Sequence, residues 1–142
     1  MLDKMIALVA EKFVGKFDKG GQPYILHCLH VMNAVCPKQD DHELMCIAVG
    51  HDLIEDTDIT GDDLRAMGYS QRVVSGIEDM THKQGEDYLD VYIRRIAANP
   101  DTRVCKREDL THNSAIMRMK GLREKDFRRL EKYHRAYQYL ED

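Results

Sequence analysis

Apolar residues recur every three to four positions along most of this chain, which is the period of an amphipathic helix. Leu2, Met5, Val9 and Phe13 follow this spacing and predict a first helix at the start of the sequence. No stretch alternates apolar and polar residues as a half-buried strand does, and no internal repeat is present. We therefore expect one all-α domain over residues 1–142, a length that suffices for a single hydrophobic core.

Helix-start and helix-stop residues predict where the second helix lies. The polar segment 16–22 contains two glycines and reads as a loop. Pro23 is favourable in the first turn of a helix, and the apolar stretch 24–35 follows it directly. Pro37 then ends the helix, because proline cannot continue the backbone hydrogen bonding.

The apolar run 44–50 is short enough to be either a buried strand or a buried helix. Asp40 followed three residues later by Glu43 has the spacing of a capping box and favours the helix. Capping residues, glycines and one Asn-Pro pair predict further helices, which cover residues 60–68, 70–80, 86–98, 102–119 and 122–142.

Composition indicates a folded domain and argues against a nucleic-acid partner. The hydrophobic fraction is 43% and the charged fraction 32%, which is too apolar for a disordered chain. The formal net charge is −4, whereas a protein that binds a phosphate backbone usually has a basic excess. Basic residues do gather between Arg118 and Arg129, but Glu124 and Asp126 are interspersed. We interpret that stretch as a solvated helix face.

The cysteines and the N-terminal residues suggest a cytoplasmic protein. Cys28, Cys36, Cys46 and Cys105 form no C-x-x-C pair, so we expect free, buried thiols in a reducing compartment. The first residues do not combine a cationic start with an apolar stretch, as a secretion signal does. No run approaches the roughly 18 apolar residues of a membrane span, so no membrane partner is expected.

Four polar residues follow the apolar run 44–50. On a continuous helix His51, Asp52, Glu55 and Asp56 would lie at about 0°, 100°, 40° and 140°, and so within one sector. Three carboxylates and an imidazole beside a buried helix repel one another and lose solvation, so they need a compensating cation. A divalent metal suits these ligand types. The alternative is an exposed helix end, although acidic residues there oppose the helix dipole.

Further metal ligands have to come from other segments. His27 and His30 are one turn apart in the apolar second helix, and each could instead be an ordinary core histidine. Asp109 and Asn113 share one face of a later helix, which by itself is only a polar face. The local pattern therefore leaves the remaining ligands open.

Three strings appear in a specific order: Gly-Gln-Pro-Tyr-Ile-Leu-His at 21–27, His-Asp-Leu-Ile-Glu-Asp-Thr at 51–57, and Lys-Arg-Glu-Asp-Leu-Thr-His-Asn at 106–113. A histidine, then HD-x-x-ED, then D-x-x-x-N resembles the HD superfamily. More narrowly, the set is similar to the hydrolase domain of RelA/SpoT proteins and to the small alarmone hydrolases. The resemblance runs from about Lys19 to Asn113 and implies a compact helical HD-domain fold.

The resemblance also implies roles for individual residues. In the family Glu55 and Asp56 would act around the attacking water, with either one as the general base. Lys19 and Asn113 would lie near the nucleotide, and Lys106 would be either a further site cation or a structural lysine. The metal, usually manganese in this family, would be held by His27, His51, Asp52 and Asp109.

The implied reaction removes pyrophosphate from the 3′ position of ppGpp or pppGpp and returns GDP or GTP, so the expected partner is a small nucleotide. Asp18 stands where the family often has an arginine that helps to hold the purine base, and Cys28 stands where proline is usual. Another nucleotide or dinucleotide, such as NADPH or a nucleoside monophosphate, is therefore an alternative substrate. A non-catalytic nucleotide-binding module is a third interpretation. The oligomeric state is not predicted.

Overall fold

The computed structural model describes residues 1–141, so residue 142 of the expected domain lies outside the described part. Within residues 1–141 the regular elements are all helical, as predicted, and none of the helices is long and apolar enough to cross a membrane. An isolated bridge pairs Phe17 with Pro23. The elements are α1 (Leu2–Lys12), α2 (Tyr24–Val35), α3 (His42–Val49), α4 (Leu53–Asp56), α5 (Gly61–Ala66), α6 (Gln71–Asp79), the π-helical η1 (Tyr88–Ile93), α7 (Arg94–Ala97), α8 (Pro100–Asn113), the 3₁₀ turn η2 (Ile116–Arg118) and α9 (Glu124–Glu141).

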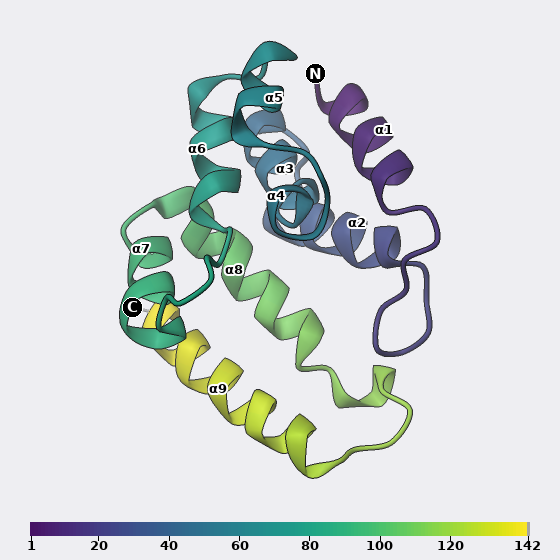
Figure 1. Ribbon diagram of the computed structural model, residues 1–142, viewed down its shortest axis with the longest axis vertical. Helices are drawn as coiled ribbons and strands as arrows, with labels where there is room; N and C mark the ends of the chain where they lie inside the picture. The colour runs from purple at the N-terminus through teal and green to yellow at the C-terminus, as the bar shows by residue number, and fades with distance from the viewer. Residues whose placement is uncertain (142) are drawn as a thin grey trace.

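Helix α8 runs between two groups of helices (Figure 1). It packs against α2, α3 and α6 on one side and against α7 and α9 on the other. Each group has its own apolar core, and α8 contributes Cys105 to the first and Leu110 to the second. Lys106, Asp109 and Asn113 recur every three or four residues along α8, so they share one stripe of this helix. The polar stripe therefore lies on the helix that both groups share.

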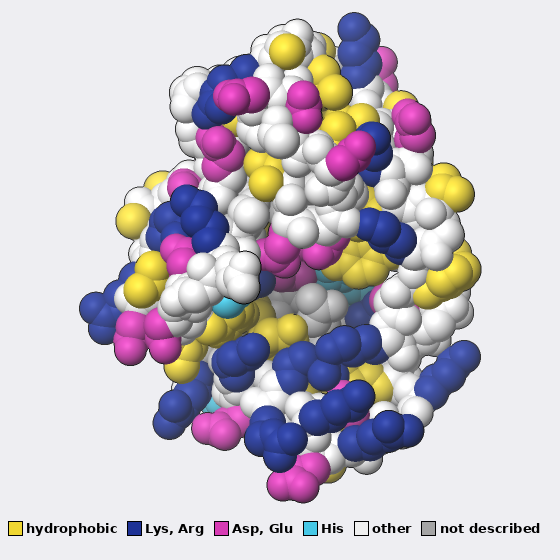
Figure 2. All heavy atoms as spheres, in the orientation of Figure 1, with side chains coloured by type: hydrophobic (Ala, Val, Ile, Leu, Met, Phe, Trp, Pro, Cys, Tyr) yellow, Lys and Arg dark blue, Asp and Glu magenta, His cyan; other side chains and the backbone are white. Residues whose placement is uncertain are grey.

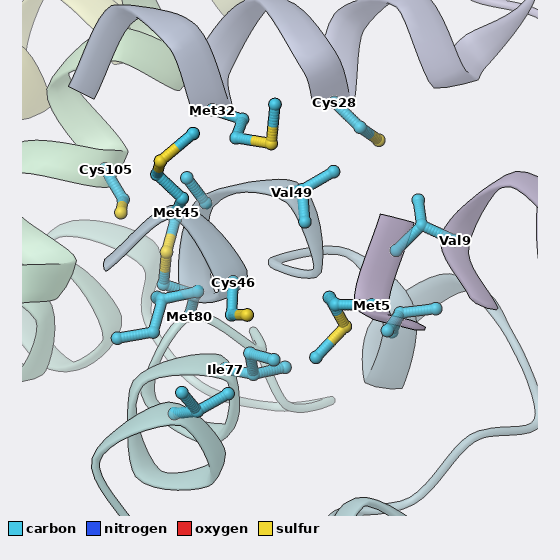
Figure 3. Close-up of a cluster of buried hydrophobic side chains, with 14 of the residues drawn as sticks. Met5, Val9, Cys28, Met32, Met45, Cys46, Val49, Ile77, Met80 and Cys105 are labelled. Carbon is cyan, nitrogen blue, oxygen red and sulfur yellow. The ribbon is translucent and has the colours of Figure 1, made fainter. Parts of the chain in front are cut away.

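Helix α3 is enclosed by its neighbours because it is apolar on nearly every side. Its residues 45–49 are all buried, and α1, α2, α6 and α8 pack around it. Figure 3 shows that methionine and cysteine side chains pack together in this core. Methionine is flexible and fills irregular gaps well. All four cysteines are buried and free, as predicted. The labelled members of the core are Met5, Val9, Cys28, Met32, Met45, Cys46, Val49, Ile77, Met80 and Cys105.

The expectation of one continuous helix through His51 and Asp56 is wrong. Helix α3 ends at Val49, the chain turns through Gly50, and α4 begins at Leu53. The amide of Leu53 donates to the carbonyl of Gly50 at 3.0 Å, which closes this turn. A Cβ on Gly50 would lie 3.0 Å from the Cδ1 atom of Ile77 and 3.1 Å from a methionine sulfur, so a larger residue would push α3 away from its neighbours.

The cap of α3 is Asp41 rather than Asp40. The Asp41 carboxylate accepts a hydrogen bond from the amide of Leu44 at 3.1 Å, because the helix starts one residue later than the Asp40–Glu43 spacing predicts. Glu43 does not return a bond to the cap; its carboxylate pairs with Arg72 at 3.2 Å. The sequence therefore predicted the helix but placed its capping box one residue too early.

Later boundaries are partly as predicted. Thr60 and Asp63 form the predicted capping box, and Ser70 caps α6. The helix expected over 86–98 is a π-helical segment followed by a short α-helix. Pro100 begins α8 instead of only ending the preceding helix, since proline is well tolerated at the first helical position. The same helix ends at Asn113 rather than near residue 119, and the remainder forms the η2 turn.

Candidate metal centre

Three segments bring four potential ligands together in the interior. Helix α2 provides His27, the turn between α3 and α4 provides His51 and Asp52, and α8 provides Asp109. The Nε2 atom of His27 lies 2.9 Å from Oδ1 of Asp109, and the Nε2 atom of His51 lies 3.4 Å from the same oxygen. The Oδ2 atom of Asp52 is 3.0 Å from Nε2 of His51. All but Asp52 are at most 4% exposed.

The tautomer of His51 makes it suitable as a metal ligand. Its Nδ1 atom lies 2.6 Å from the carbonyl oxygen of Ala48, which can only accept, so Nδ1 carries a proton. Its Nε2 atom is buried and has no hydrogen-bond partner within residues 1–141. That nitrogen faces the carboxylates of Asp52 and Asp109, an arrangement that requires a cation between them. Two imidazoles and two carboxylates fit a divalent transition metal.

The charge balance in the cluster also requires a cation at the His51 nitrogen. Burial disfavours the charged form of His51, but the carboxylates of Asp52 and Asp109 outweigh burial and raise its pKa well above the usual value. Burial likewise opposes ionisation of Asp109, yet Lys106 and His51 hold its pKa well below the ordinary range. The carboxylates therefore remain ionised, and a cation at the His51 nitrogen, either a proton or a metal, compensates them.

Lys106 lies beside this centre rather than on a solvated helix flank. Its side chain is largely buried, and its Nζ atom lies 2.9 Å from Oδ2 of Asp109. Burial opposes the charge on Lys106, but Asp109 and the hydroxyls of Tyr92 and Tyr88 raise its pKa well above the usual value. Lys106 thus binds Oδ2 of Asp109, whereas Oδ1 faces the histidines.

Asn113 and Tyr24 hold the carboxylates in place. The Nδ2 atom of Asn113 donates to Oδ1 of Asp109 at 2.9 Å, one turn along α8. The hydroxyl of Tyr24 donates to Oδ2 of Asp52. Burial, with the nearby Asp52 charge, raises the Tyr24 pKa, so this hydroxyl remains a donor. Tyr24 was not singled out from the sequence because only the fold places it against Asp52.

Glu55 and Asp56 lie on the open side of the centre. One carboxylate oxygen each from Asp52, Glu55 and Asp56 lies within 4.8 Å of the other two. Partial burial, followed by the charges of Asp52 and Glu55, raises the pKa of Asp56 to about 6. Burial also raises the pKa of Glu55, although its Oε1 atom accepts the amide of His82 at 2.7 Å. Asp56 can therefore exchange protons near neutral pH, and the pKa of Glu55 is shifted in the same direction.

A column of histidines supports His27 from behind. The Nδ1 atoms of His27 and His112 are 2.7 Å apart, and the two rings are stacked. His30, which is exposed, also stacks on His112, with a centroid distance of 3.9 Å. Burial, with the nearby charge of Arg118, lowers the pKa of His112 to about 4. A neutral His112 can accept the His27 Nδ1–H and leave Nε2 of His27 free for a ligand.

A pocket of about 240 Å³ adjoins the centre. Tyr24, Asn113 and Tyr133 line both this pocket and the cavity that contains Asp52, Glu55 and Lys106, so the two spaces are contiguous. Figure 2 shows acidic side chains around a central recess and a band of basic side chains below it, over α9. The other charged residues that line the pocket are Asp18, Lys19, Arg118 and Arg129.

The basic stretch 118–129 is thus only partly a solvated face, contrary to expectation. Arg123, Lys125 and Arg128 are exposed, whereas Arg118 and Arg129 are half-buried in the pocket wall. The turn of the chain after α8 and the packing of α9 on α8 bring them there. Amphipathic spacing cannot show this, because the position of both residues depends on the chain reversal after α8.

Two curated proteins are similar to this chain over most of its length. The guanosine-3′,5′-bis(diphosphate) 3′-pyrophosphohydrolase of Aquifex aeolicus is 31% identical over 111 residues, which cover 72% of this chain and 16% of that protein. The enzyme of the same name from Haemophilus influenzae is 32% identical over 124 residues, 81% of this chain and 18% of that protein. The chain therefore spans less than a fifth of the length of these relatives.

A solved structure has the same fold. It belongs to a metazoan ortholog of SpoT described as hydrolysing ppGpp and as having a role in starvation responses. The TM-score is 0.77 at 16% identity, and the match covers 98% of this chain and 84% of the other. No protein-family model matches the chain. In sequence and in fold, the chain is a RelA/SpoT hydrolase-like domain of the HD superfamily.

Proposed function

We propose that this chain is a metal-dependent (p)ppGpp 3′-pyrophosphohydrolase, which releases pyrophosphate and returns GDP or GTP. The observation that carries the proposal is the buried convergence of two imidazoles and two carboxylates beside a basic pocket. The names of the two bacterial relatives support the choice of substrate. A small nucleotide is therefore the proposed partner, and the buried free thiols agree with a reducing, cytoplasmic setting.

The metal would be held by His27, His51, Asp52 and Asp109, and we propose manganese. Carboxylate oxygens are ligands that Mn²⁺ accepts readily, and the imidazoles increase affinity for a transition metal over Mg²⁺. When bound, the metal would polarise the scissile phosphoryl group. Lys106, Asn113 and Tyr24 would keep the ligand carboxylates oriented through the hydrogen bonds described above.

Glu55 and Asp56 are the proposed proton-transfer groups. Hydrolysis forms a bond between the water oxygen and the 3′ phosphorus and breaks the bond from that phosphorus to the ribose oxygen. One proton leaves the water and one joins the ribose oxygen. A carboxyl group with a pKa of about 6, as at Asp56, is well matched to accept and return a proton at neutral pH.

The pocket would hold the rest of the nucleotide. Lys19 and Arg129 offer positive charge to phosphate groups, and Tyr133 offers an aromatic face to a base. Burial, with the nearby Arg129 charge, lowers the pKa of Lys19, which is the expected effect of cations gathered around an anion site. Asn113 lines the pocket and also contacts Asp109, so it would connect nucleotide and centre.

Product analysis tests the proposal. Purified protein loaded with Mn²⁺ would be incubated separately with ppGpp, pppGpp, NADPH and nucleoside monophosphates. We expect pyrophosphate together with GDP from ppGpp. Orthophosphate release from NADPH or a monophosphate, without cleavage of ppGpp, would favour the other substrate class that Asp18 suggests. No turnover on any member of the panel would favour a nucleotide-binding module.

A further inference from the structure

Two loops are joined at one wall of the pocket. The loop between α1 and α2 contributes Asp18, whose Oδ1 atom accepts the amides of Gly20 and Gln22, each at 2.9 Å. Its Oδ2 atom lies 2.5 Å from Nη2 of Arg118, in the segment between α8 and α9. A Cβ on Gly20 would lie 2.3 Å from the carbonyl oxygen of Arg118, so the two backbones meet without room for a side chain. The Asp18 side chain thus links the two loops, since it accepts hydrogen bonds within its own loop and pairs with Arg118 of the other.

The guanidinium of Arg118 is fixed at both ends. Nη2 donates to Asp18, and Nη1 donates to the carbonyl oxygen of His112 at 2.7 Å. The side chain is 30% exposed and lines the pocket next to Asn113. Arginine has five N–H donors in one plane, and these two bonds use only two of them. The others, with the planar face, remain available to a ligand in the pocket.

A guanidinium that can only donate discriminates between purines. Guanine presents two adjacent acceptors, N7 and O6, whereas adenine presents one acceptor beside an amino donor. A bidentate arginine contact therefore favours guanine, by about 1–3 kcal/mol in known complexes. The carbonyl of His112 and the carboxylate of Asp18 fix the plane of Arg118, which reduces the ordering cost of such a contact.

We infer that Arg118 selects a guanine base in the pocket and that Asp18 is the positioning residue that holds it there. The inference rests on the proposed function for the nature of the ligand, a guanine nucleotide. It also explains the role of Asp18, which is to position Arg118. The Asp18 carboxylate lies in the same pocket wall and holds the guanidinium of Arg118, which would contact the base.

The test is calorimetric binding of GDP and ADP to the Mn²⁺-loaded protein, which needs no turnover. We expect wild type to prefer GDP, and Arg118→Ala to lose at least about tenfold of GDP affinity with little change for ADP. Arg118→Lys should also lose the preference, because an ammonium cannot make the bidentate contact. Arg128→Ala is the matched control, since Arg128 pairs with Glu124 on the exposed face of α9.

Asp18→Asn tests the positioning role. It should weaken GDP binding in the presence of Arg118 but add little to Arg118→Ala, so the double variant should resemble the single one. Manganese affinity of every variant checks that the centre is intact. Equal affinity of wild type for GDP and ADP, or equal loss of both ligands in Arg118→Ala, would overturn the inference. Guanine selection by Arg118 without cleavage of ppGpp would refute only the proposed function.

Discussion

The Nδ1 atoms of His27 and His112 lie 2.7 Å apart, so one of them must donate and the other accept. The low pKa of His112, about 4, keeps its ring neutral, so its Nδ1 can serve as the acceptor. In this structure the Nε2–H of His27 donates to Oδ1 of Asp109 at 2.9 Å. With a metal bound in place of that proton, His27 would keep its proton on Nδ1, facing His112, and Nε2 would be the ligand atom. A residue outside the proposed ligand set would thus hold a proposed ligand in its metal-binding tautomer.

His112→Phe should therefore weaken manganese binding by about 10- to 100-fold, the usual effect of removing such a supporting partner. Phenylalanine keeps the stacked ring but cannot accept the His27 proton. Calorimetric titration with Mn²⁺ measures the change. His30→Phe is the matched control, because it alters the neighbouring ring of the stack without touching the hydrogen bond to His27. Equal losses in both variants would refute the tautomer argument.

Asp109→Ala should abolish metal binding and also destabilise the fold. The substitution removes the partner of the buried Lys106 ammonium as well as the acceptor for His27. Leaving one member of a buried ion pair uncompensated costs roughly 3–5 kcal/mol. Asp52→Ala should lose the metal with a smaller stability loss, since Asp52 is more exposed and has no lysine partner among residues 1–141. Urea unfolding of the metal-free proteins would separate the two effects, and equal stability losses would contradict the prediction.

The pH dependence of turnover should identify the role of Asp56. Its pKa is raised to about 6, so the carboxylate form that accepts a proton is lost as the pH falls through that value. We expect kcat/KM of wild type to fall below about pH 6, and Asp56→Asn to remove this limb together with most of the rate. A full rate in Asp56→Asn would exclude it as the base.

Glu55→Gln should keep manganese affinity and lose most of the turnover, since Glu55 lies outside the ligand cluster but within reach of Asp52 and Asp56. Its carboxylate also accepts the amide of His82, a bond that glutamine can retain. Metal titration and single-turnover cleavage of ppGpp on the same preparation separate binding from chemistry. An unchanged rate would show that the charge of Glu55 is dispensable.

Local spacing predicted the helical class and grouped His51 with Asp52, whereas His27 and Asp109 were added only by the resemblance to the HD superfamily. The strings around His27, His51 and Asp109 are short, and the structure brings these three together from separate segments. The turn at Gly50 was not predictable from amphipathic periodicity. It depends on how closely α1 and α6 approach that residue, which is a tertiary property.

The residues that support the centre were not predictable from the sequence, because their contacts also depend on tertiary structure. Tyr24 and His112 lie within the recognised strings, but neither spacing nor composition shows that they touch Asp52 or His27. Arg118 and Arg129 reach the pocket only because the chain reverses after α8. The one local signal for His112 was its place directly before Asn113 in the third string.

Gly50→Ala should show how strongly packing positions the ligands. The added Cβ would lie 3.0 Å from Ile77 and 3.1 Å from the sulfur of Met5, so α3 or its neighbours must shift. Overpacking of this kind costs about 1–3 kcal/mol. Because His51 is the next residue, manganese affinity should fall along with the free energy of unfolding. Gly68→Ala is a contrasting control: its Cβ would meet no atom within 4 Å, so only its positive φ of 93° would be strained and metal affinity should be unchanged. Normal metal affinity in a destabilised Gly50→Ala protein would mean that the position of His51 does not depend on this contact.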